Sequence, residues 1–121
     1  MIKVLIFLFA VLQIITATRF DVISPSVTEC ICATNVDAAL VQKWLKNGEY
    51  PNDPCFMCFM KCVGAFLGFM DTAGVVNESG LAASFNVSIE IVQNCTKSVA
   101  PLLDLCEKAY RHAVCVESKI P

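Results

Sequence analysis

Three cysteines fall within eight positions of this sequence, at Cys55, Cys58 and Cys62, in the stretch CFMCFMKC. Thiols at such close spacing serve one of three kinds of chemistry. They hold a metal ion, exchange electrons as a dithiol, or form disulfide bonds. The chain has 8 cysteines in all, and the others lie between Cys30 and Cys115. The choice among the three chemistries depends on the compartment of the protein and on the elements that carry the cysteines.

The N-terminal residues have the pattern of a secretory signal peptide. One basic residue precedes an apolar run over residues 4–15, and the small residues Thr16-Ala17-Thr18 follow it. The run is too short to span a bilayer comfortably. We therefore expect a signal peptide over residues 1–17 and a secreted, extracellular protein. An even number of cysteines in a short exported chain is typical of a disulfide framework.

The rest of the chain, residues 18–121, is expected to form one domain without a membrane span. The whole sequence carries 9 lysine and arginine residues and 11 acidic residues, a net charge of −2. It has no block of basic residues, so nucleic acid and anionic membranes are poor candidates for partners. A domain of this size buries one modest core, which the cysteines can support covalently.

The hydrophobic pattern predicts helices and gives almost no strand signal, so we expect an all-α fold. Proline, aspartate and serine residues stand at the expected helix starts, where they are favoured. The expected bundle has about six helices, over residues 25–33, 37–46, 55–70, 78–85, 88–98 and 101–116. Cys106 and Cys115 are nine positions apart and would point to opposite sides of one helix. They should therefore bond to different neighbours.

The cysteine spacing resembles the six-cysteine signature of the insect odorant-binding proteins, the pheromone- and general odorant-binding family. The matching elements of the signature are Cys58-x3-Cys62, then Cys95, then Cys106-x8-Cys115. The surrounding segments are similar as well, namely CICATNV at 30–36, KNGEYPND at 46–53 and CEKAYRHAVC at 106–115. The resemblance extends over nearly all of the expected mature chain.

The resemblance implies three disulfide bonds, Cys30–Cys62, Cys58–Cys106 and Cys95–Cys115. Cys32 and Cys55 depart from the six-cysteine pattern, and we expect them to form a fourth bond with each other. Whether Cys30 or Cys32 pairs with Cys62 stays open, although the register of the following Thr-Asn-Val favours Cys30.

The resemblance also implies a function, that of a secreted carrier which binds small hydrophobic ligands reversibly in an internal cavity. Odorants and pheromones are the implied ligands, olfaction and transport the implied roles, and a membrane receptor a candidate partner. Pockets for such ligands are largely apolar and measure roughly 300–1,000 Å³. The candidates for the ligand-binding wall are Trp44, Phe59, Met60, Val63, Phe66, Met70, Phe85, Val92, Tyr110 and Val114. The alternative is a secreted gland or reproductive-fluid interaction protein on the same fold.

A zinc site is the competing use of the cysteines, since Cys30-x-Cys32 and Cys55-x2-Cys58 together would supply four thiolates. Export and the need for bridges disfavour it. A redox dithiol at Cys55-x2-Cys58 lacks the strand-to-helix setting of such sites. We therefore expect neither a metal nor a cofactor.

Nothing in the sequence assembles a catalytic set, so we expect no enzymatic activity. His112 is the only histidine, and we expect it on the solvent-exposed surface. A general base usually needs an orienting carboxylate and a nucleophile nearby. Three sequons at Asn77, Asn86 and Asn94 are candidates for N-glycosylation, which fits an exported protein.

Overall fold

A computed structural model describes residues 22–120 of the chain, and the expected signal peptide lies outside this range. The all-α prediction is confirmed within it. A first helix covers residues 22–34. It is followed by α2 (Ala38–Asn47), α3 (Pro54–Phe66), α4 (Glu78–Phe85), α5 (Ile89–Val99) and α6 (Leu105–Ser118). Extended pairing among these residues is limited to one bridge between Met70 and Val76.

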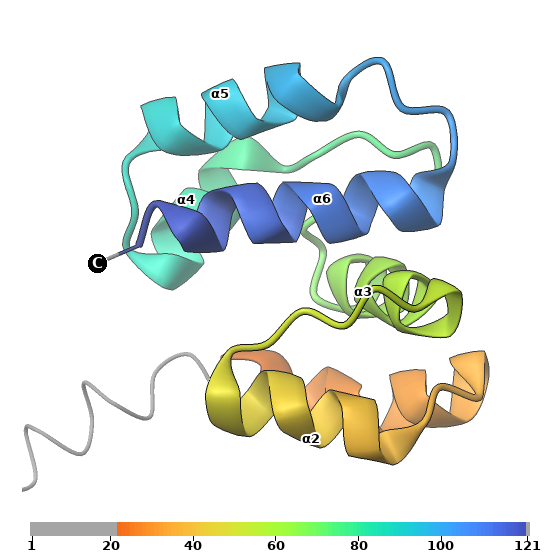
Figure 1. The fold of residues 1–121 in the computed structure, drawn as a ribbon. Coiled ribbons are helices and arrows are strands. Elements are labelled where there is room, and N and C mark those ends of the chain that lie inside the picture. The colour runs from red at the N-terminus through yellow and green to blue at the C-terminus, as the bar shows by residue number, and fades with distance from the viewer. Residues whose placement is uncertain (1–21, 121) are drawn as a thin grey trace, which may run out of the picture.

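Helix α3 lies in the middle of the bundle (Figure 1). The first helix and α2 lie on one side of it, and α4, α5 and α6 lie on the other. Helix α3 packs most extensively on α6, and α5 packs on both α4 and α6. A helix in this position is buried on more than one side, which explains why the sequence of α3 is apolar around most of its circumference.

Helices α2 and α3 begin and end where local sequence signals indicate. The Asp37 side chain accepts a hydrogen bond from the N–H of Ala39 at 2.9 Å and caps α2. Gly48, with a φ of 68°, ends that helix in a left-handed conformation. Asp53 caps α3 by accepting from the N–H of Phe56 at 2.9 Å, and Pro54 occupies the first turn.

Three helix boundaries differ from the expectation by three or more residues. The first helix is already formed at residue 22, before Pro25, because proline fits within a first helical turn. Helix α3 ends at Phe66 instead of residue 70, as Gly68 turns left-handed with a φ of 76°. Helix α6 begins at Leu105 instead of residue 101, because the Asp104 side chain accepts from the N–H of Glu107 at 3.0 Å.

The structure contains the three disulfide bonds that the resemblance implies. Cys30–Cys62 joins the first helix to α3, Cys58–Cys106 joins α3 to α6, and Cys95–Cys115 joins α5 to α6. The open choice for the partner of Cys62 is thus resolved in favour of Cys30. Each bond connects two helices of the bundle.

The expected fourth disulfide bond is not formed, since Cys32 and Cys55 are both free and exposed. The helix geometry gives the reason. Residues two positions apart on an α-helix are separated by about 200° of rotation. Cys30 faces α3 to reach Cys62, so Cys32 points away from α3 and from Cys55 at its start.

All three sequon asparagines are exposed. Asn77 caps the start of α4, where its side chain accepts from the N–H of Gly80 at 3.2 Å. Asn86 ends the same helix with a φ of 52°. Asn94 lies on α5 beside the disulfide-bonded Cys95. Glycosylation at these positions stays a prediction.

The buried side chains form two clusters. The first centres on an aromatic group in which Trp44, Phe56 and Phe59 pack with ring centroids 5.6 to 6.0 Å apart. The second joins α4, α5 and α6 through Leu81, Val92 and other residues. Phe85 packs against both clusters, and it therefore lies at the boundary between them.

Candidate ligand-binding site

An almost entirely apolar cavity of about 100 Å³ lies between the two clusters. Its wall draws on the first helix, α2, α3, α4, α6 and two connecting loops. The lining residues are Ile23, Trp44, Tyr50, Met60, Val63, Gly64, Phe69, Met70, Val76, Leu81, Phe85, Ala109, His112, Ala113, Val116, Glu117 and Ile120. The volume lies below the range for drug-sized ligands and is comparable to engineered cavities that admit benzene. A ligand that fits without rearrangement is therefore small.

Five of the ten candidates from the sequence line this cavity: Trp44, Met60, Val63, Met70 and Phe85. They come from α2, α3, the loop after α3, and α4. Residues that lie far apart in the sequence are thus brought together around one apolar space. Their role in binding stays a prediction.

The other five candidates are not in the wall. Phe59 is fully buried in the aromatic group, and Val92 is fully buried in the second cluster. Phe66 is 46% exposed at the end of α3. The Tyr110 hydroxyl donates to the Tyr50 carbonyl oxygen at 2.9 Å, and Val114 packs against the first cluster from outside. The apolar pattern identified burial in most of these cases, but it could not distinguish core from cavity wall.

His112 is buried, with 4% of its surface exposed, and it lines the cavity. The expectation of a surface histidine is wrong. Its Nε2 atom lies 3.1 Å from Oγ1 of Thr96 on α5. Burial lowers the pKa of His112 below its usual 6.5, although the Val92 backbone and the charge of Glu78 act in the opposite direction. The ring is therefore neutral at neutral pH.

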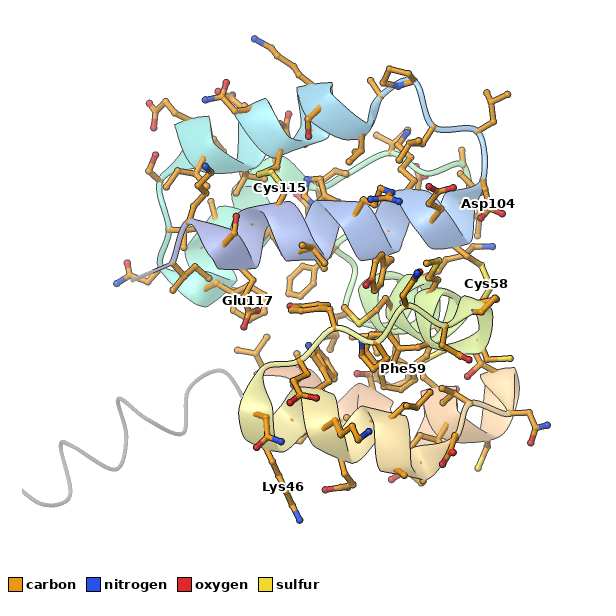
Figure 2. The ribbon with its side chains drawn as sticks, in the orientation of Figure 1. Lys46, Cys58, Phe59, Asp104, Cys115 and Glu117 are labelled. Atoms are coloured by element: carbon orange, nitrogen blue, oxygen red, sulfur yellow. A yellow bond between two sulfur atoms is a disulfide. The ribbon has the colours of Figure 1, made fainter. Side chains whose placement is uncertain are left out.

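A hydrogen-bonded polar pair forms part of the cavity wall. The Tyr50 hydroxyl donates to Oε2 of Glu117 at 2.7 Å, and both residues belong to the wall. With the bond from Tyr110 to the Tyr50 carbonyl, this links the loop after α2 to α6. Figure 2 shows Glu117 and Asp104 at opposite ends of α6, with Cys115 on the side of the helix toward α5.

The comparisons with known proteins agree with this fold. The sequence profile of the PBP/GOBP family matches residues 16–119, which is most of the chain. The chain belongs to the PBP/GOBP family. It is also similar to general odorant-binding protein 99b of Drosophila melanogaster, with 26% identity over 98 residues. That match covers 73% of this chain and 65% of the relative, so the chain spans just under two thirds of the relative's length.

The cavity-facing residues of α6, and Ile120 just after it, were not identified from the sequence of this PBP/GOBP protein, although a signal was present. Ala109, His112, Ala113, Val116, Glu117 and Ile120 are spaced alternately three and one positions apart. This is the stripe that one face of a helix presents. The expectation that His112 lies on the solvent-exposed surface concealed the pattern.

The described part of this PBP/GOBP chain offers no other site of comparable chemistry. Within residues 22–120, no three histidine, cysteine, aspartate or glutamate side chains gather closely enough to hold a metal ion. Over the same residues, no helix has the length and apolar character that crossing a membrane requires. The cavity is therefore the candidate functional site.

The buried His112 predicts a dependence of stability on pH. Above pH 6.5 the ring is neutral in both the folded and the unfolded chain. Below that pH the unfolded chain binds a proton, whereas the folded chain does so only at its lower pKa. Stability is therefore lost as the pH falls through this interval. Between about pH 7.5 and about pH 5, we expect the parent to lose more unfolding free energy in urea than His112→Gln. Equal losses would contradict the burial of a neutral ring.

Proposed function

We propose that this protein is a secreted carrier that reversibly binds one small hydrophobic ligand in the cavity between the two core clusters. The observation that carries the proposal is an almost entirely apolar cavity in a chain of the PBP/GOBP family. Transfer of apolar ligand surface from water to such a wall is favourable by about 25 cal/mol per Å². Export is part of the proposal and rests on the signal-peptide pattern of residues 1–17.

The mechanism is binding in a largely preformed site. The first helix, α3, α5 and α6 are connected by disulfide bonds, so the part of the wall that they carry is held in place before the ligand arrives. Helices α2 and α4 contain no cysteine, and they carry Trp44, Leu81 and Phe85 in the wall. A ligand larger than the cavity would therefore enter by moving α2 or α4 outward.

The test is saturable binding of a small apolar compound, measured by calorimetry with toluene and by displacement of a fluorescent apolar probe. Ala113 lines the cavity, and Ala113→Phe should fill it and weaken binding more than tenfold. Ala65 is exposed on α3, so Ala65→Phe is the matched control and should bind like the parent. Circular dichroism checks that both variants fold.

Absence of saturable binding by the parent would refute the carrier proposal. Equal weakening by Ala65→Phe and Ala113→Phe would place the ligand elsewhere. A secreted gland or reproductive-fluid interaction protein with a vestigial or different ligand role is the alternative on the same fold, and the comparisons do not favour it.

A further inference from the structure

We infer that the cavity selects small ligands that carry a hydrogen-bond donor, such as an alcohol, and that His112 accepts this bond through Nδ1. The inference deepens the proposed carrier function and rests on it. It names the chemical class of the ligand and the atom that recognises it.

The contact with Thr96 determines which nitrogen of His112 carries the proton. The Thr96 hydroxyl donates its only proton to the backbone oxygen of Val92 at 2.9 Å. Toward His112 Nε2, 3.1 Å away, the Thr96 oxygen can therefore act only as an acceptor. We therefore assign the hydrogen to Nε2, and in a neutral imidazole this leaves Nδ1 with a lone pair.

The ring of His112 contacts Thr96 through Nε2. Among the residues that the structure describes, Nδ1 therefore has no donor to pair with its lone pair. The side chain is 4% exposed and belongs to the cavity wall. A hydrogen-bond donor on a ligand in the cavity would pair with this lone pair. An apolar ligand would leave this lone pair without a donor, and a carbonyl oxygen would bring another lone pair against it.

A hydrogen-bonded pair at the wall, Tyr50 in the loop after α2 and Glu117 on α6, is consistent with the same class of ligand. The Tyr50 hydroxyl proton is already donated to Glu117, so it is not available to a carbonyl or carboxylate oxygen of a ligand. The wall thus favours a neutral ligand with a donor over an ester, an aldehyde or a carboxylate.

The size of the cavity defines the test compounds. A volume of about 100 Å³ suits a single aromatic ring or a short chain. Toluene, benzyl alcohol, benzaldehyde and benzoate share a ring and differ in the polar group. Benzyl alcohol should bind roughly three- to tenfold more tightly than toluene, as expected for one satisfied hydrogen bond. Benzaldehyde and benzoate should not bind more tightly than toluene.

Variants separate recognition by His112 from general packing, and the ratio of benzyl alcohol to toluene affinity is the quantity to compare. His112→Leu should bring this ratio to about one, since it removes the acceptor. His112→Asn retains an acceptor near the Nδ1 position and should keep part of the preference. Arg111→Leu is the matched control, because Arg111 is exposed on the same helix, and its ratio should equal that of the parent.

Nitrogen NMR supplies a readout that a purely structural role would not change. Because His112 is the only histidine, its two ring nitrogens are assigned without ambiguity. The free protein should show hydrogen on Nε2 and none on Nδ1. Titration with benzyl alcohol should shift the Nδ1 signal, and titration with toluene should not. Thr96→Val removes the group that holds the Nε2 proton and should reduce both this tautomer and the alcohol preference.

The outcomes distinguish this inference from the carrier function. Toluene that binds as tightly as benzyl alcohol would overturn the inference and leave the carrier function standing. A proton on Nδ1 in the free protein would also overturn it. If none of the four compounds binds saturably, both the carrier function and the inference fail. If His112→Leu does not fold, the Thr96→Val ratio and the nitrogen spectra of the parent decide.

Discussion

Replacing Cys58 and Cys106 together by serine is expected to lower the free energy of unfolding by about 4 kcal/mol. This bond spans 48 residues, the longest of the three separations. The loss of chain entropy in the unfolded state grows with the length of the closed loop, and the shorter Cys95–Cys115 loop should contribute about 3 kcal/mol. The bond also joins α3 to α6, the two helices that pack most extensively.

The measurement is urea-induced unfolding followed by circular dichroism under non-reducing conditions. The chain offers its own control, because Cys32 and Cys55 are free and exposed. Replacing both of them by serine should change the unfolding free energy by less than about 0.5 kcal/mol. If the variant without Cys32 and Cys55 lost as much unfolding free energy as the variant without Cys58 and Cys106, Cys32 and Cys55 would form a bond in the folded protein.

Phe59→Ala is expected to destabilise the protein by about 3–5 kcal/mol, as is typical of phenylalanine truncation in a core. The Phe59 ring is fully buried and lies 5.8 Å from the Trp44 ring and 5.6 Å from the Phe56 ring. Figure 2 places it between α3 and α2. Alanine would leave a void in the centre of this aromatic group.

Phe66→Ala is the matched control on the same helix. Phe66 is 46% exposed, so its removal should cost less than about 1 kcal/mol. Equal losses for the two variants in urea unfolding would contradict the placement of Phe59 in the core. The comparison also tests a difference that the sequence did not reveal, since both phenylalanines were candidates for the cavity wall.

Much of the fold could be predicted because the signals are local. Asp37 and Asn47-Gly48 bound α2, and the expected helix over residues 78–85 coincides with α4. Cysteine spacing led to the family, which the profile match confirms. The predicted start of α6 was wrong. Pro101 was taken as the start, whereas the helix begins at Leu105 and is capped by Asp104.

The site was harder to predict because its residues are selected by tertiary packing. Nearly every side of α3 is apolar, so periodicity alone could not separate Val63, which lines the cavity, from Phe59, which does not. His112 is buried because α5 supplies Thr96 as a hydrogen-bond partner. No property of residues adjacent to His112 in the sequence indicates that partner.

The three disulfide bonds overlap along the sequence. Cys30–Cys62 overlaps Cys58–Cys106, which in turn overlaps Cys95–Cys115. Every peptide bond between Cys30 and Cys115 therefore lies inside at least one closed ring. A protease that cleaves the backbone once anywhere in this range leaves both fragments covalently attached. Such a nicked molecule would separate into two pieces only after reduction, so in a fluid rich in proteases a single cut would not release either part.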